Sequence, residues 1–411
     1  MKLGRQTRGR RSWLPICPCT VEKESLKIKS ENHTGGAGLA SLLVEAVECM
    51  SFVSKRGIVI EKAGGPDVLK LVELDDPPLG DDEVLIRIAA TAVNRIDLQC
   101  RLFGSRNSFN GGLYIPGLEC SGIIIAVGQG VTEWKVGDKV CALLNGAGYA
   151  EQVAVSAKMV LPVPSNVPLT HAASLPEAAH NAWKVISEAQ LVRGRKLLLH
   201  ECCGYVGLFV LQMAKCKGAV VYVTAETDEK LDFYKRHGAD ICINCKNEDL
   251  VTRVMEETRQ KGIDVVVDSW AVNLEKDLKI LSDWGKLLFV DLHGPKGGNL
   301  YLTAVMTKQA RVQVLNRWWK TLDRAACIVD HLKKEVWPEI ENGSVKPVVY
   351  ETLPLSEAAA AHKLMELTDY GQDMWSVIGY FVPWLGHYAC TGKVAGHVMG
   401  KILLTPDFEE S

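Results

Sequence analysis

The chain has 411 residues, of which 47% are hydrophobic and 23% charged, and its formal net charge is -2. This length is enough for two domains, because single hydrophobic cores stop growing near roughly 250–300 residues. The near-neutral balance provides no basic field for nucleic acid or for an anionic membrane surface. No apolar run reaches the ~18 residues of a membrane span. We therefore expect a small-molecule partner, with no nucleic acid and no membrane span.

Residues 1–54 show no sustained apolar period, and we expect a disordered N-terminal extension there. Its first fifteen residues are basic, with no acidic residue before Glu22, so organelle targeting is the alternative to a cytoplasmic location. The 13 cysteines lack the paired CxxC spacing of a zinc module, and the chain is too long to need a disulfide framework. We expect mostly reduced thiols.

The predicted elements fall into two patterns along the chain. Short β-type runs separated by turns predict a mainly β domain, with strands at Gly57–Ile60, Val84–Ala89, Gly122–Val127, Lys139–Leu143 and Glu151–Val155. Buried runs separated by helix-length segments then follow at Lys196–His200, Val220–Thr224, Ile241–Asn244, Val265–Asp268 and Lys286–Val290. This alternation predicts a parallel, doubly wound sheet. Further elements are expected at Arg311–Leu315 (strand), Lys320–Glu341 and Ser356–Leu367 (helices) and Lys401–Leu404 (strand).

A turn with spaced glycines joins the first buried strand of the second pattern to a helix. In a dinucleotide-binding turn the second glycine lets the backbone approach the pyrophosphate, the third lets helix and strand pack, and the helix N-terminus attracts the anion. Gly204 and Gly207 occupy the second and third positions. Cys202 replaces the first glycine, and bulky Tyr205, followed by Val206, stands beside the predicted phosphate path. A purely structural glycine turn is the alternative.

Glu226 lies near the end of the second strand of this pattern. An acidic residue at that point can accept a hydrogen bond from the adenosine ribose 2′-OH, which favours NAD(H) over NADP(H). The alternative is a solvated carboxylate at the start of the next helix, because Thr227, Asp228 and Glu229 follow directly.

Several short motifs occur in order: Asn94-Arg95-Ile96-Asp97, Gly117–Gly122, Val127–Val131, Trp134–Val140, Gly148–Glu151 and Leu175–Ala178. This ordered set resembles the medium-chain dehydrogenase/reductase superfamily, in particular the zinc-free quinone oxidoreductase (zeta-crystallin-like) branch and the small quinone reductases of plants and animals. The resemblance covers about residues 56–365 and resumes at Met399–Leu404. It implies an α/β fold, with a GroES-like β-rich catalytic domain (55–175 and 313–411) and an inserted Rossmann doubly wound parallel-sheet domain (176–312). Residues 369–398 form an atypical insertion, interpreted as a surface loop or as retained intron sequence.

The resemblance also implies an activity. Relatives of this branch transfer a hydride directly from nicotinamide to a quinone or a conjugated carbonyl acceptor, without metal. Zinc-dependent relatives carry a histidine where this chain has Leu118, and their four-cysteine loop is missing, so we expect no metal. NADPH follows from the resemblance, with NADH possible because of Glu226. An enal/enone double-bond reductase and a catalytically impaired binding protein of the same fold are the alternatives, and a homodimer is implied.

Site residues follow from the same resemblance. Asn94 is expected near the nicotinamide and the acceptor, with Arg95 and Asp97 as a supporting ion pair; for Asn94 a turn-capping amide is the alternative. Cofactor contacts are expected from Asn181, Gly204, Tyr205, Val206, Gly207, Glu226, Lys230, Leu292 and Asn316. Departures from the family pattern cluster around the cofactor, at Asn181, Cys202, Tyr205, Cys245, Trp270 and Trp318. Four of them, Cys202, Tyr205, Trp270 and Trp318, motivate the impaired alternative.

Overall fold

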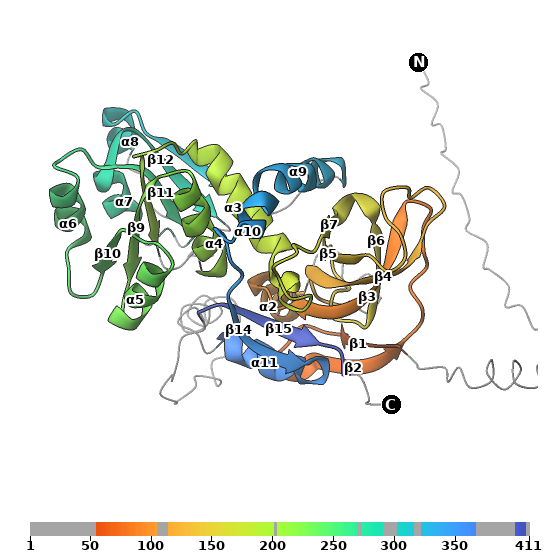
Figure 1. The fold of residues 1–411 in the computed structure, drawn as a ribbon. Helices are drawn as coiled ribbons and strands as arrows, with labels where there is room; N and C mark the ends of the chain where they lie inside the picture. The colour runs from red at the N-terminus through yellow and green to blue at the C-terminus, as the bar shows by residue number, and fades with distance from the viewer. Residues whose placement is uncertain are drawn as a thin grey trace, which may run out of the picture. The chain divides into compact units, whose positions relative to one another are not determined.

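A computed structural model describes residues 55–104, 114–200, 204–269, 271, 273–290, 302–315, 322–366 and 399–407. The expectations for residues 1–54, Cys202, Trp270, Leu292, Asn316, Trp318 and the 369–398 insertion concern positions outside these residues. The described chain forms two large sheets, one mainly antiparallel and one parallel, with helices on the parallel sheet (Figure 1). The mixed α/β architecture predicted from the sequence is confirmed.

The seven-stranded sheet has the order β14-β15-β3-β4-β5-β7, with β6 also paired to β3. Its strands are β3 (Glu83–Ala92), β4 (Glu119–Val127), β5 (Lys139–Leu143), β6 (Gln152–Ser156), β7 (Val160–Pro162), β14 (Val349–Pro354) and β15 (Lys401–Thr405). Leu403 of β15 pairs antiparallel with Ala92 of β3, so the last strand joins the sheet beside the strand that precedes Asn94. A separate antiparallel pair consists of β1 (Lys55–Ile60) and β2 (Leu69–Leu74).

The six-stranded sheet has the order β10-β9-β8-β11-β12-β13, and every neighbouring pair in it is parallel. Its strands are β8 (Lys196–His200), β9 (Val220–Ala225), β10 (Ile241–Asn244), β11 (Ile263–Asp268), β12 (Leu281–Val290) and β13 (Arg311–Leu315). Neighbouring residues of one strand belong to different cores: Leu197 and Leu199 lie in one hydrophobic cluster and Leu198 in another. Both faces of the sheet are therefore covered at its central strands, which explains the continuous apolar runs there, whereas the edge strand β13 is largely exposed.

Helices connect and flank these strands. They are α2 (Arg95–Phe103), α3 (Pro176–Ala189), α4 (Gly204–Cys216), α5 (Asp228–Arg236), α6 (Leu250–Glu257), α7 (Leu274–Ile280), α8 (Leu302–Thr307) and α11 (Ala358–Glu366). The stretch expected as one helix over Lys320–Glu341 is instead two, α9 (Leu322–Glu335) and α10 (Trp337–Glu341). Pro338 lies in the first turn of α10, and proline, which lacks a backbone N–H and clashes with the preceding turn, is tolerated there but not inside a helix.

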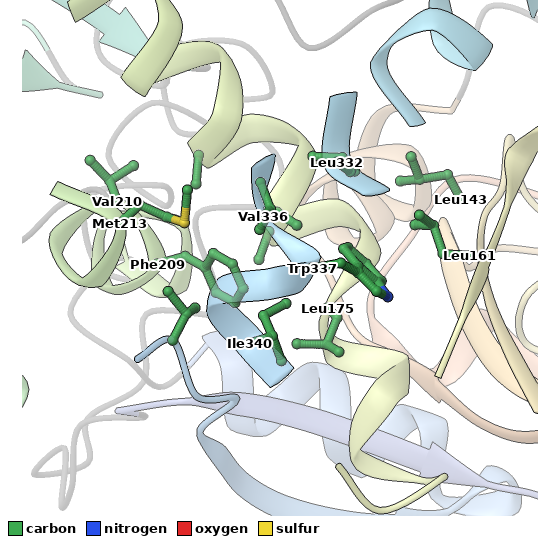
Figure 2. Packing of buried hydrophobic residues seen from close by; sticks show 14 of the residues in the cluster. Leu143, Leu161, Leu175, Phe209, Val210, Met213, Leu332, Val336, Trp337 and Ile340 are labelled. Atoms are coloured by element: carbon green, nitrogen blue, oxygen red, sulfur yellow. The ribbon is translucent and has the colours of Figure 1, made fainter. Parts of the chain in front are cut away.

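Side chains of α9 and α10 join several elements into one hydrophobic cluster. Figure 2 shows Trp337 and its neighbours between residues of α4 and residues of β5 and β7. The Trp337 indole Nε1 donates a hydrogen bond of 2.7 Å to the Pro162 carbonyl oxygen, and Asn166 Nδ2 donates one of 2.8 Å to the Ile340 carbonyl oxygen. This packing anchors the segment after the parallel sheet. In the described part of the chain, no helix is long and apolar enough to cross a membrane.

Candidate active site

The glycine turn predicted from the sequence lies at the point where the strand order of the parallel sheet reverses. From β8 the chain proceeds to β9 and β10 on one side and then crosses to β11, β8's other neighbour. In open α/β sheets, ligands bind outside the carboxyl ends of the strands at such a point. Helix α4 begins there with Gly204, whose φ of 53° is in the left-handed region that favours glycine, and Gly207 is buried one turn later. A side chain at Gly204 would therefore strain the turn, and the role of these two glycines in holding a dinucleotide pyrophosphate stays a prediction.

The second predicted cofactor position lies at the end of β9. Glu226 directly follows this strand, and its Oε2 is 2.7 Å from the Lys246 ammonium group. Both side chains are about half exposed, at 51% and 59%. Thr227 is the N-cap of α5, and its Oγ1 accepts a hydrogen bond from the Lys230 backbone N–H. Glu226 is thus a paired surface carboxylate one residue before the helix, and Lys230 is buried.

Asn94 belongs to a buried polar network that the sequence reasoning missed. Its Oδ1 accepts a hydrogen bond of 2.6 Å from the Lys401 ammonium group, and its Nδ2 donates one of 3.0 Å to Glu119 Oε1. Lys401 is also 2.9 Å from the same carboxylate oxygen. All three residues are at most 4% exposed. The network therefore joins the N-cap of α2 to the starts of β4 and β15.

Glu119 extends this network to helix α3. Its Oε2 accepts a hydrogen bond of 2.9 Å from the backbone N–H of Glu177, in the first turn of α3. The Glu177 carboxylate in turn accepts from Asn181 Nδ2. Burial raises the pKa of the Glu119 carboxyl, an effect that Lys401 opposes and the charge of Glu177 reinforces. Two of the predicted site residues, Asn94 and Asn181, are thus connected by two carboxylates.

The signal that could have revealed these residues lay in the motifs themselves. Glu119, Glu177 and Lys401 each stand in one of the family motifs or in the final strand, among mainly apolar neighbours. A charged side chain buried beside apolar ones requires a partner of opposite charge. The sequence pattern alone does not say which charges meet.

Tyr205 directs its side chain toward this network. Its hydroxyl donates to Ser174 Oγ at 3.2 Å and accepts from the Val348 backbone N–H at 3.4 Å. The Lys401 ammonium group lies 5.2 Å from the centroid of the Tyr205 ring. Burial raises the pKa of Tyr205, which keeps the hydroxyl neutral. The tyrosine that the sequence places beside the phosphate path therefore contacts the turn that precedes α3, through Ser174, and Lys401.

Asp97 holds the start of α2. One of its carboxylate oxygens accepts from the Asn94 backbone N–H at 2.8 Å and the other from the Gly117 backbone N–H at 3.0 Å. Gly117 has a φ of 103°, so the loop before β4 also depends on a glycine. The ion pair between Arg95 and Asp97 stays a prediction. Val206 is half-buried in the first turn of α4, beside Tyr205.

Within the residues that the structure describes, no group of three or more histidine, cysteine, aspartate or glutamate side chains is placed to hold a metal ion. Five of the described cysteines are free thiols: Cys120, Cys141, Cys216, Cys242 and Cys327. The expectation of a zinc-free site stays a prediction.

A parallel sheet with a glycine turn at its switch point, beside a mainly antiparallel β sheet, defines the class of two-domain dinucleotide-binding dehydrogenases. Two family models match the chain: "Alcohol dehydrogenase GroES-like domain" over residues 80–165 and "Zinc-binding dehydrogenase" over residues 206–326. Quinone oxidoreductase from Sus scrofa is 31% identical over 311 residues, which are 74% of this chain and 92% of the relative. The chain belongs to the quinone oxidoreductase family of the medium-chain dehydrogenase/reductase superfamily, as its motifs predicted.

Two further relatives bear on the cofactor and the acceptor. The chloroplastic NADPH-dependent alkenal/one oxidoreductase of Arabidopsis thaliana is 30% identical over 364 residues, 85% of each chain. A mycobacterial protein solved in complex with NADPH is 25% identical, with a TM-score of 0.69, and the match covers 85% of this chain and all of that one (100%). The superfamily places a nicotinamide dinucleotide in this fold.

Proposed function

We propose that the protein is an NAD(P)H-dependent reductase that transfers a hydride to a quinone or to another conjugated carbonyl compound. The observation that carries the proposal is the left-handed Gly204 at the start of α4, at the switch point of the parallel sheet. The names of the porcine and plant relatives supply the acceptor class. The bound nicotinamide supplies the hydride, and the protein binds and orients the two reactants.

Each part of the site has a proposed role. The backbone N–H groups of the first turn of α4 hold the pyrophosphate, and Gly207 allows α4 to pack closely. Asn94 supports the acceptor side from within the structure, because Lys401 and Glu119 engage its amide and its exposure is only 3%. Asp97 fixes the backbone that carries Asn94. Asn94 and Asp97 are therefore proposed as positioning residues.

For the cofactor we propose NADPH, with weaker use of NADH. The pair between Glu226 and Lys246 reduces the local negative potential at the end of β9, where the adenosine ribose is expected. Lys246 can then meet a 2′-phosphate as a point charge, whereas Glu226 alone would repel it. The NADPH named for two of the matched proteins supports this choice.

The test of the function is a titration followed by turnover. Purified protein is titrated with NADPH and NADH by fluorescence, then assayed with 1,4-benzoquinone, 9,10-phenanthrenequinone and a simple enone. Gly204→Val should weaken nucleotide binding at least about tenfold, since a β-branched residue does not adopt this φ. Gly194→Val is the matched control, because Gly194 also has a left-handed φ, 83°, but lies before the amino end of β8.

The results separate the candidate functions. Turnover of the enone but of neither quinone favours an enal/enone double-bond reductase, a choice that the plant relative's name also supports. Failure of both nucleotides to bind at millimolar concentration would refute the enzyme and leave a binding protein of this fold. Equal losses in Gly204→Val and Gly194→Val would refute the pyrophosphate site.

We also propose a homodimer that forms through β13, an edge strand of the parallel sheet. Large apolar side chains are exposed on and near it, at Trp284 (66%), Leu302 (66%), Met306 (72%) and Val314 (57%). An exposed edge strand with apolar side chains invites pairing with a second copy. Light scattering should give twice the chain mass for wild type and a lower mass for Val314→Asp. Val192→Asp, at a position 60% exposed and remote from β13 in sequence, should stay dimeric.

The cytoplasmic location stays a prediction.

A further inference from the structure

We propose that Lys401 and Tyr205 act together as positioning residues that tie the cofactor turn to the Asn94 side of the active site. This inference rests on the proposed function, because it concerns how the same site is held in place. Neither residue needs to touch the nucleotide or the acceptor for the role.

The position of Lys401 is set by partners from separate elements. Its ammonium group meets Asn94 Oδ1 at 2.6 Å and Glu119 Oε1 at 2.9 Å, and it lies 5.2 Å from the ring centroid of Tyr205. Its side chain is 5% exposed, so water cannot replace a lost partner. A buried charge with several partners is held in one geometry, since leaving it unpaired is strongly unfavourable.

The position of Tyr205 is set on two sides as well. The ring faces Lys401, and its hydroxyl bonds to Ser174 and to the Val348 backbone. A second ring, that of Phe209 one turn later, contacts it edge to face at 6.2 Å. These contacts hold the residue next to Gly204, whose backbone forms the proposed pyrophosphate turn.

Tyr205 and Lys401 connect the cofactor turn to Asn94 through consecutive contacts. Gly204 is bonded to Tyr205, the Tyr205 ring contacts Lys401, and Lys401 holds the Asn94 amide. Loss of the Tyr205 ring or of the Lys401 cation therefore removes one link between the cofactor turn and the Asn94 amide. Nucleotide affinity and the placement of the acceptor are expected to be coupled through this path.

A purely structural role makes a different prediction. If the contacts only stabilised the fold, their loss would lower the melting temperature and leave ligand affinities unchanged. The informative quantities are therefore the NADPH dissociation constant, the acceptor KM and kcat, measured on folded variants. The coupling between the two residues is read from a double-mutant cycle.

The variants are Tyr205→Leu, which removes ring and hydroxyl, Tyr205→Phe, which keeps the ring, and Lys401→Met, which removes the cation. Lys401→Arg keeps the charge and is the conservative control; Lys401→Gln, which removes the charge but can still form hydrogen bonds, serves if Lys401→Met does not fold. Lys286→Met is the matched control: Lys286 is 8% exposed and donates to the Glu188 carbonyl oxygen at 2.6 Å, in a different part of the fold.

We expect Tyr205→Leu and Lys401→Met each to raise the NADPH dissociation constant by about five- to tenfold, as for loss of a desolvated cation–π contact. The double variant Tyr205→Leu/Lys401→Met should bind NADPH no more weakly than the weaker-binding of the two single variants. Lys401→Arg should stay within about twofold of wild type, because it keeps the charge, and Tyr205→Phe, which keeps the ring but loses the two hydroxyl hydrogen bonds, should lie between wild type and Tyr205→Leu. Lys286→Met should lower only the melting temperature.

Two results would overturn the inference while leaving the function intact: additive losses in the double variant, or wild-type affinities in both single variants. Failure of the proposed function is recognised separately, because wild type itself would then bind no nucleotide and reduce no acceptor.

Discussion

The sharpest prediction concerns the surface pair at the end of β9, because it decides between the two nicotinamide cofactors. Lys246→Gln should weaken NADPH and leave NADH nearly unchanged, since only NADPH carries the 2′-phosphate. Glu226→Gln should have the opposite effect: it removes the repulsive carboxylate, which strengthens NADPH binding, and it replaces the charged acceptor of the ribose 2′-OH hydrogen bond with a weaker neutral one, which weakens NADH binding.

The size of the effect follows from the exposure of the pair. The two charges are 2.7 Å apart, yet both side chains are more than half exposed, so solvent screens them. Unit charges at about 4 Å interact by about 1 kcal/mol in water, and exposed ion pairs contribute about 0.2–1 kcal/mol. A phosphate bears more charge than a carboxylate. We therefore expect the NADPH/NADH preference to fall about fivefold in Lys246→Gln and to rise about two- to fivefold in Glu226→Gln.

The assay is the ratio of the two dissociation constants at low and at high salt. Screening should reduce the difference between wild type and Lys246→Gln as the ionic strength rises from about 0.05 to 0.5 M. Lys279→Gln is the control, because Lys279 and Glu275 form a pair of the same length, 2.7 Å, with exposures of 57% and 60% on α7. An unchanged ratio in Lys246→Gln, or equal weakening of both nucleotides, would refute the reasoning.

Two further predictions concern stability. Burial, together with the charge of Arg101, holds the pKa of His362 well below its usual value of 6.5. Below about pH 6.5 the unfolded chain therefore binds a proton at His362 that the folded chain does not bind. The free energy of unfolding should fall by up to about 1.4 kcal/mol for each pH unit below that value. Urea unfolding at pH 7.5 and 5.5 should show a smaller loss for His362→Gln, and equal losses would contradict the prediction. Asp97→Ala removes the acceptor of two backbone N–H groups, one of them that of Gly117, and should cost about 1–3 kcal/mol in urea unfolding at pH 7.5. The exposed Asp67→Ala should have little effect, and a similar loss there would argue against the role of Asp97.

The strands of the parallel sheet were the most predictable part of the fold. Lys196–His200, Ile241–Asn244 and Arg311–Leu315 have the predicted bounds. The first two are short, mainly apolar runs bounded by turns and covered on both faces, and the third, Arg-Val-Gln-Val-Leu, alternates polar and apolar residues up to its last position, so local composition carries the signal. β14 was not predicted, because Val349–Pro354 contains exposed Tyr350 and Glu351 and gains its strand form only by pairing with β15.

The candidate site was less predictable, for a physical reason. Motifs identified Asn94, Asn181 and the glycine turn, but not the charges that connect them. Lys401 and Asn94 are 307 positions apart in the chain, and only the antiparallel pairing of β15 with β3 brings them together. A buried ion pair depends on such long-range register, which neither periodicity nor composition records.

The contacts of Tyr205 also change how its departure from the family pattern is interpreted. A bulky residue next to the pyrophosphate turn suggests a blocked site when only the sequence is considered. In the structure Tyr205 has a donor, an acceptor and a cation around it, contributed by Val348, Ser174 and Lys401. A side chain that merely filled a disused pocket would not require three polar partners. The substitution therefore argues for an altered way of holding the turn, and the nucleotide titration of Tyr205→Leu is the measurement that separates this from loss of the cofactor.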